Sequence, residues 1–174
     1  MQMTDSRIIA APPAVVWAAL LDPDVLKAAV PGCEELSGTV ADGYEAAVVQ
    51  KVGPVKARFA GIVTFADIVE GRSLTLHGEG KGGAAGFAKG TAHVALEPEG
   101  EGTKLSYDVE ARVGGKLAQL GSRIIDGFAR KMADDFFTRF AEAVEGPAEA
   151  APDAGSDPAE PPKKGWFKRV LGRD

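Results

Sequence analysis

The spacing of apolar residues near the N-terminus changes from that of a strand to that of a helix. The first residues predict a strand that ends near Ile9. Apolar residues then recur at helical spacing over residues 13–21, with proline in the first turn, where the missing N–H costs nothing. A second short helix over residues 25–29 ends before Pro31 and Gly32. This part of the chain therefore predicts one strand followed by two short helices.

Apolar and polar residues alternate from residue 34 to residue 113. A period of two is that of a strand with one buried face. Glycine-rich turn signals divide the region into about six antiparallel strands, which predicts a meander. These turns lie at residues 41–43, 53–54, 70–71, 82–83 and 99–102.

The apolar period returns to 3.6 after Gly114 and Gly115. Apolar residues then step by three or four over about 27 residues, which predicts one long amphipathic helix. An antiparallel sheet of about seven strands buries its inner face most simply if it curves around such a helix. The sequence thus predicts an α+β helix-grip fold. The residues that define the apolar stripe are Leu117, Leu120, Ile124, Phe128, Met132, Phe136 and Phe140.

Small residues gather on the predicted inner face of the sheet. A glycine inside a strand costs roughly 0.5–1 kcal/mol relative to alanine, so a glycine cluster indicates close backbone approach or room for a ligand. We expect an apolar ligand cavity between the sheet and the long helix. The alternative is that Phe128, Met132 or Phe136 fills the gap. The expected cavity residues are Phe59, Gly61, Val63, Leu76, Gly78, Gly80, Ala88, Gly90, Ala92, Tyr107, Leu117, Leu120, Ile124, Phe128 and Met132.

Few polar side chains point inward in the predicted register. They are the phenols of Tyr44 and Tyr107 and the amide of Gln50. A catalytic pocket needs convergent titratable groups, so the pattern indicates a protein that is not an enzyme. His77 and His93 fall on the outer face, and two ligands without a third make a weak metal site. We therefore expect no catalytic residues and no metal.

Two motifs in the chain resemble functional motifs but have simpler explanations. Residues 78–83 read GEGKGG and match a dinucleotide-binding pattern, but a strand follows them where that pattern requires a helix. We interpret these glycines as a hairpin and a cavity wall. Cys33 is followed by Glu34 and Glu35, whose charges raise the pKa of a thiol, so we interpret it as a structural residue.

Composition divides the chain into a body, a linker and a tail. Residues 1–144 have the length of one domain. Residues 145–162 are acidic, rich in proline and alanine, and lack large apolar side chains, so we expect a disordered linker. The chain carries a net charge of −5, and because the linker contributes −5 and residues 163–174 contribute +4, the body carries −4. Such a body is a poor candidate for nucleic-acid binding.

The last segment, residues 163–174, predicts an amphipathic membrane anchor. Its apolar residues lie at i, i+1, i+4 and i+5 on one helical face, and bases surround them. Burying the four apolar side chains would contribute at most roughly 6–12 kcal/mol, offset by ordering the helix, so we expect reversible attachment. The alternatives are docking on a partner protein, packing on the body, and disorder. The anchor residues are Lys163, Lys164, Trp166, Phe167, Lys168, Arg169, Val170, Leu171 and Arg173.

The sequence contains no apolar run of the roughly 18 residues that span a bilayer. The apolar stretch at residues 8–21 has the length of a signal-peptide core, but Pro12 and Pro13 interrupt it and Asp5 precedes it. We interpret it as part of the fold. We therefore expect a cytoplasmic protein that lies peripherally on the inner face of the cytoplasmic membrane.

Four segments of the body resemble a known family. They are APPAVVWAALLDP at residues 11–23, PGCE at residues 31–34, GKGGAAGFAKGTA at residues 80–92 and GGKLAQLGSR at residues 114–123. Together they resemble the CoxG proteins, which are accessory proteins of aerobic carbon monoxide dehydrogenase. This family lies within the START/polyketide-cyclase-like (SRPBCC) helix-grip superfamily. The resemblance extends over about residues 3–144.

The resemblance implies an accessory protein of a molybdenum hydroxylase of the carbon monoxide dehydrogenase type. That partner is a molybdopterin, flavin and iron–sulfur enzyme, and the implied role is to attach it to the inner membrane. The implied role, together with the expected cavity and anchor, suggests that the body binds an apolar, lipid-like molecule. Our hypothesis is that this molecule is a quinone. The alternatives are a START- or cyclase-like enzyme and a membrane adaptor with a solid interior.

Overall fold

The computed structural model describes residues 1–145. The chain divides into two units, Met1–Phe140 and Ala141–Asp174, and the described part of the second unit is the end of the last helix. Residues 146–174, which contain the expected linker and the expected membrane anchor, lie outside the described residues.

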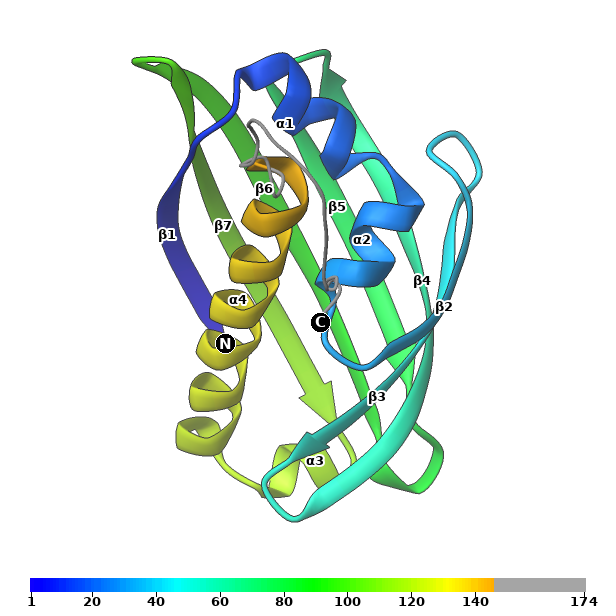
Figure 1. Ribbon diagram of the computed structural model, residues 1–174. Helices are drawn as coiled ribbons and strands as arrows, with labels where there is room; N and C mark the ends of the chain where they lie inside the picture. Colours follow the sequence, from blue (N-terminus) through cyan, green and yellow to red (C-terminus); the bar gives the residue numbers. More distant parts are fainter. Residues whose placement is uncertain (146–174) are drawn as a thin grey trace, which may run out of the picture. The chain divides into compact units, whose positions relative to one another are not determined.

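Seven antiparallel strands form one curved sheet in the order β1-β7-β6-β5-β4-β3-β2 (Figure 1). The predicted seven-stranded sheet with a C-terminal helix is confirmed. Every neighbouring pair from β2 to β7 is joined by a hairpin, and β1 closes the other edge by pairing with β7. The strands are β1 (Gln2–Ile9), β2 (Cys33–Thr39), β3 (Gly43–Val52), β4 (Val55–Val69), β5 (Ser73–Lys81), β6 (Phe87–Glu99) and β7 (Gly102–Gly114).

Two short helices lead from β1 to β2, as the sequence predicts. Helix α1 (Pro13–Leu20) has proline in its first turn, and helix α2 (Pro23–Ala29) follows it directly. The carboxylate of Asp22 caps α2 by accepting a hydrogen bond of 2.9 Å from the backbone N–H of Asp24. This cap satisfies one of the N–H groups that have no partner inside the helix.

The C-terminal helical region is broken, so the prediction of one continuous helix from Leu117 is wrong. A short helix, α3 (Lys116–Gln119), is separated from α4 (Ser122–Glu145) by Leu120 and Gly121. Gly121 has φ of 90°, a conformation that other residues rarely adopt, and it ends α3. The break turns Leu120 and Ile124 away from the interior. Their side chains lie against the β3–β4 turn at Gly53 instead.

The largest fully buried side chains are found at one end of the sheet. Ile9 and Thr103 face each other in the β1–β7 register, and the hydroxyl of Thr103 donates a hydrogen bond of 2.7 Å to the carbonyl of Ala11, just before α1. Phe140 is completely buried and stacks on Phe136 with ring centroids 5.6 Å apart. The solid core therefore occupies the α1 end, and the middle of the sheet is packed differently.

Replacing Phe140 with alanine should destabilise the protein by about 3–5 kcal/mol, because the substitution removes a fully buried ring from this core. The free energy of unfolding would be measured by urea titration. The matched control is Thr138→Ala, an exposed position two residues earlier on the same helix, which should change stability by less than about 0.5 kcal/mol. Equal stabilities of the two variants would contradict this view of the core.

Candidate ligand cavity

A cavity of about 610 Å³ lies between the inner face of the sheet and α4. Its wall is almost entirely apolar. The backbone of α4 stays apart from the sheet, so the two meet through side chains. The wall consists of Met1 and Met3 before and on β1; Leu20, Leu26, Val30 and Pro31 from the α1–α2 region; Cys33, Leu36, Tyr44, Ala46, Val48, Gln50 and Val52 from β2 and β3; Phe59, Val63, Phe65, Leu74 and Leu76 from β4 and β5; Ala88, Ala92, Val94, Leu105, Tyr107, Val109, Ala111 and Val113 from β6 and β7; Leu117 from α3; and Ile125, Phe128, Ala129, Met132, Ala133, Phe136 and Phe137 from α4.

Most of the residues expected in the cavity lie on this wall or beside it. Leu120 and Ile124 do not, because the helix break at Gly121 turns them outward. The expected glycines border an adjoining hollow of about 410 Å³ that shares several wall residues with the main cavity. On the main wall lie Phe59, Val63, Leu76, Ala88, Ala92, Tyr107, Leu117, Phe128 and Met132, and on the adjoining hollow lie Gly61, Gly78, Gly80 and Gly90.

The clustered glycines have two different physical causes. A Cβ atom at Gly61 would lie 2.5 Å from the carbonyl oxygen of Glu79, and one at Gly90 would lie 2.9 Å from that of Glu110. Close backbone approach therefore requires glycine at these two positions. At Gly78 and Gly80 the nearest atoms would be 3.8 and 3.7 Å away, which is ordinary contact distance. These two glycines leave room on the inner face.

The large side chains of α4 do not fill the space. Phe128, Met132 and Phe136 all reach the wall, yet about 610 Å³ remains between them and the sheet. The helix positions between them that line the cavity are Ala129 and Ala133, and the sheet also contributes small side chains to the wall. Small side chains on both the helix and the sheet therefore leave part of the space unfilled.

The polar residues on the wall are those expected from the register, together with Cys33. The hydroxyl of Tyr44 donates to the carbonyl of Leu21 at 2.5 Å, and burial raises the pKa of this phenol, with a smaller contribution from the charge of Asp22. The amide of Gln50 donates to the carbonyl of Pro31 at 2.5 Å. Each group thus fastens the α1–α2 region to β3.

The surroundings of Cys33 disfavour the thiolate form of its side chain. Its Sγ donates to the carbonyl oxygen of Glu35 at 3.4 Å. Burial raises the pKa of the thiol, and this effect outweighs the opposing influence of that hydrogen bond and of Lys27. Because the thiolate is the reactive form, a raised pKa makes the residue a weak nucleophile. The structural interpretation of Cys33 agrees with this environment.

A cluster around Arg7 joins α4 to the sheet at the end of the cavity. The Nη2 atom of Arg7 lies 2.6 Å from a carboxylate oxygen of Asp134 and 3.3 Å from the hydroxyl of Tyr107, to which it donates. Its guanidinium also lies over the ring of Phe137, 5.1 Å from the centroid. Phe137 in turn stacks on Tyr107 with centroids 5.1 Å apart. This cluster holds the C-terminal half of α4 in place.

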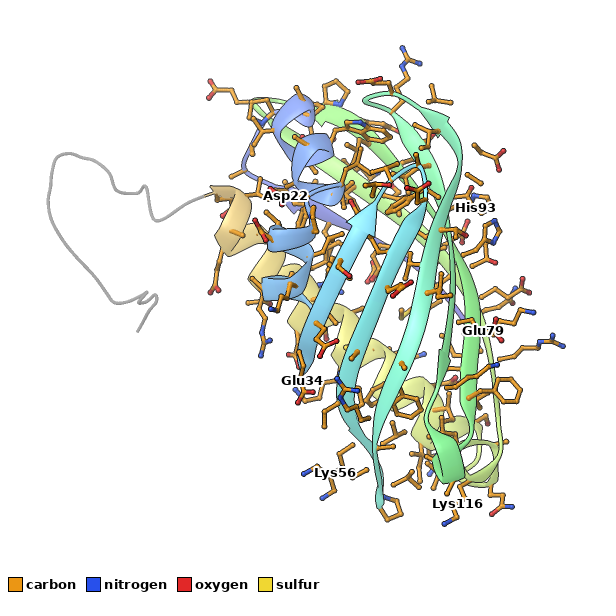
Figure 2. The ribbon with its side chains drawn as sticks, turned by 90° about the vertical axis from the view of Figure 1, so that its right-hand side faces the viewer. Asp22, Glu34, Lys56, Glu79, His93 and Lys116 are labelled. Atoms are coloured by element: carbon orange, nitrogen blue, oxygen red, sulfur yellow. The ribbon has the colours of Figure 1, made fainter. Side chains whose placement is uncertain are left out.

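The outer face of the sheet carries the two histidines, as expected, and Figure 2 shows His93 and Glu79 on the side of the sheet opposite the helices. Nδ1 of His93 lies 2.7 Å from the hydroxyl of Thr75, and Nδ1 of His77 lies 3.2 Å from that of Thr91. Within residues 1–145, no cluster of histidine, cysteine, aspartate and glutamate has the arrangement to hold a metal ion. No helix in this range is long and apolar enough to cross a membrane.

Comparison with known proteins gives one family and a set of solved structures. The family model for the CoxG subunit of carbon monoxide dehydrogenase matches residues 6–145. A conserved protein from Geobacillus kaustophilus is 29% identical, with a TM-score of 0.78 over 83% of this chain and 95% of that one. A START superfamily protein from Mycobacterium smegmatis is 13% identical, with a TM-score of 0.62 over 83% and 97%. The fold is therefore START-like. No curated protein matches the chain.

The substitution Ala92→Leu should reduce the binding of an apolar fluorescent dye severalfold, because Ala92 lies on the cavity wall. Titration of the dye measures this directly. Since the cavity has room for the larger side chain, stability should change little. Ala95→Leu, at an exposed position on the same strand, is the control and should bind dye as the unmodified protein does. A solid interior would instead give no dye binding at all and a loss of about 1–3 kcal/mol from overpacking in Ala92→Leu.

Proposed function

Because the chain belongs to the CoxG family of carbon monoxide dehydrogenase subunits, we propose that it is an accessory protein of a molybdenum hydroxylase of the carbon monoxide dehydrogenase type. In this proposal the body binds an apolar, lipid-like ligand, and the tail keeps the protein at the cytoplasmic face of the membrane. The protein itself catalyses no reaction. The observation that carries the proposal is the apolar cavity between the sheet and α4.

The properties of the cavity restrict its ligand. About 610 Å³ is within the range of small-molecule sites and is large enough for a ring system with part of an isoprenoid chain. The wall has no charged side chain, so a charged ligand would lose its hydration without a partner. The ligand is therefore uncharged and mostly apolar.

Two groups on the wall support a ligand with carbonyl oxygens. The hydroxyl of Tyr107 accepts a hydrogen bond from Arg7, and no acceptor within residues 1–145 takes its own proton. The amide of Gln50 uses one N–H on Pro31 and retains a second. A quinone has two carbonyl acceptors on an apolar ring, which matches donors of this kind. A quinone also accepts the electrons that a molybdenum hydroxylase must pass on, so we assign it as the ligand.

The proposed membrane attachment depends on residues 163–174. Their composition combines an apolar face with surrounding bases, which suits an anionic membrane surface. The acidic segment at residues 145–162, if flexible, would give the body a reach of roughly 21–25 Å from that attachment point. A body on such a tether could receive a quinone from the bilayer and present it to the hydroxylase.

A vesicle experiment tests both parts of the proposal. The full chain is incubated with anionic vesicles that contain a quinone, the vesicles are pelleted, and protein and quinone are measured in both fractions. The full chain should appear partly in the pellet, and the protein left in solution should carry quinone. A chain that ends at Pro162 should leave the pellet, whereas Ala92→Leu should remain in the pellet but carry several times less quinone.

The variant Ala95→Leu is the control for quinone uptake, because it makes the same substitution on the outer face. Equal sedimentation of the full and shortened chains would remove the anchor from the proposal. Protein that takes up no quinone, or takes up equal amounts in the two leucine variants, would remove the ligand.

A further inference from the structure

The charges of the body are separated between its two ends. Because the strands are joined by hairpins, successive turns lie at alternate ends of the sheet. One end consists of the β3–β4 turn, the loop between β5 and β6, α3 and the first turn of α4, and it is called the basic end here. The exposed bases that define the basic end are Lys51, Lys56, Lys81, Lys116 and Arg123.

The strand register brings these bases together from three distant parts of the chain. Lys51 and Lys56 are direct cross-strand partners beside the β3–β4 turn. Lys81 pairs with Phe87, which pairs with Gly114, two residues before Lys116. Arg123 precedes Ile124, whose side chain lies against Gly53 in the β3–β4 turn. Figure 2 shows Lys56 and Lys116 extending from the same end of the body.

The opposite end, where α1 and the other hairpins lie, is acidic. Its acidic side chains are all exposed, and they come from the α1–α2 junction, from the hairpin turns and from the ends of β4 and β6; Arg72, in the β4–β5 turn, is an exposed base at this end. The net charge of −4 for residues 1–144 therefore conceals two ends of opposite sign. The acidic end carries Asp22, Asp42, Asp67, Glu70, Glu97, Glu99 and Glu101.

The bases of the basic end lack acidic partners. None of the salt bridges within residues 1–145 involves any of the five. Arg58 lies on the same side of β4 as Lys56, but it is bound to Glu34 and Glu35 and is left out of the set. Like charges directly opposite each other on neighbouring strands are unfavourable, so the Lys51–Lys56 pair indicates a surface that meets an external anion.

Apolar side chains are exposed at the same end. Ile124 is 40% exposed and Phe87 is 42% exposed. Directly behind them, Val52, Leu117 and Ile125 line the cavity. The contact of Ile124 and Leu120 with Gly53 thus lies between the cavity and the surface. Bases mixed with exposed apolar residues suit an anionic bilayer, which offers both headgroup charge and an apolar interior.

We propose that the basic end is a docking face for an anionic lipid bilayer, separate from the C-terminal tail. It orients the body so that the part of the cavity lined by Val52, Leu117 and Ile125 lies toward the lipid. The acidic end then lies toward the cytoplasm. The passage of a ligand between bilayer and cavity at this end rests on the function proposed above. The docking itself does not, because it depends on charge and exposed apolar surface alone.

Two full-length variants with equal charge change test the docking face. Lys56→Glu/Lys116→Glu reverses two charges at the basic end, and Lys27→Glu/Arg72→Glu reverses two exposed charges elsewhere. Both retain the tail, and circular dichroism checks their folding.

Each base near an anionic leaflet strengthens binding by roughly fivefold, so the first variant should bind phosphatidylglycerol vesicles at least about 25-fold more weakly than the unmodified chain. The second should bind within about threefold of it. The difference should disappear on neutral phosphatidylcholine vesicles and shrink at high salt.

A second readout reports which end faces the lipid. In full-length chains whose Trp17 and Trp166 are replaced by phenylalanine, tryptophan is introduced at Ile124 in one variant and at Ile8, an exposed position near the acidic end, in another. Brominated lipid should quench the fluorescence of Ile124→Trp more strongly than that of Ile8→Trp. The proposal is overturned if the two charge variants bind vesicles equally, or if the two positions are quenched equally. Either result points to membrane binding by the tail alone, or to an acidic partner protein at the basic end. Either result leaves quinone uptake and the effect of the shortened tail unchanged, so the two proposals fail separately.

Discussion

The space between the sheet and α4 exists because the helix is supported at both ends and faced by small residues in the middle. At one end, Arg7 binds Asp134 and lies over Phe137, and Phe140 is buried beyond them. At the other end, Leu120 and Ile124 lie against the β3–β4 turn. Between these supports, Ala129 and Ala133 of α4 and several alanines of the sheet line the cavity. Phe128, Met132 and Phe136 reach the cavity wall but leave about 610 Å³ unfilled.

The cavity leaves many apolar side chains of its wall without packing partners on one side. An apolar occupant would restore the missing contacts and stabilise the fold. The cavity therefore makes sense as a binding site, and its apolar wall determines the class of ligand.

The sequence predicted the sheet well because its outer face is polar and its inner face is apolar. Alternation placed Phe59, Val63, Leu76 and Ala92 on the cavity side, and the structure agrees. The helical region was harder, because a 3.6-residue period counted from Leu117 continues through Gly121 without interruption. The backbone at Gly121 breaks that period, which explains why Leu120 and Ile124 lie against Gly53 and not on the cavity wall.

Other features could not be read from local patterns at all. Met1 and Leu26 reach the cavity from segments too short to show a clear period. The basic end combines bases from three separate parts of the chain, and the net negative charge of the body hides it. Such features depend on strand register, which follows from the folded sheet.

The proposed function requires the body to carry an apolar small molecule in the cavity. Native mass spectrometry of the full chain, purified without detergent from the cells that naturally make it, tests this most directly. We expect a one-to-one complex of the polypeptide with an uncharged prenyl lipid. Collisional activation should release the lipid from this complex. A spectrum that shows the mass of the polypeptide alone would contradict it.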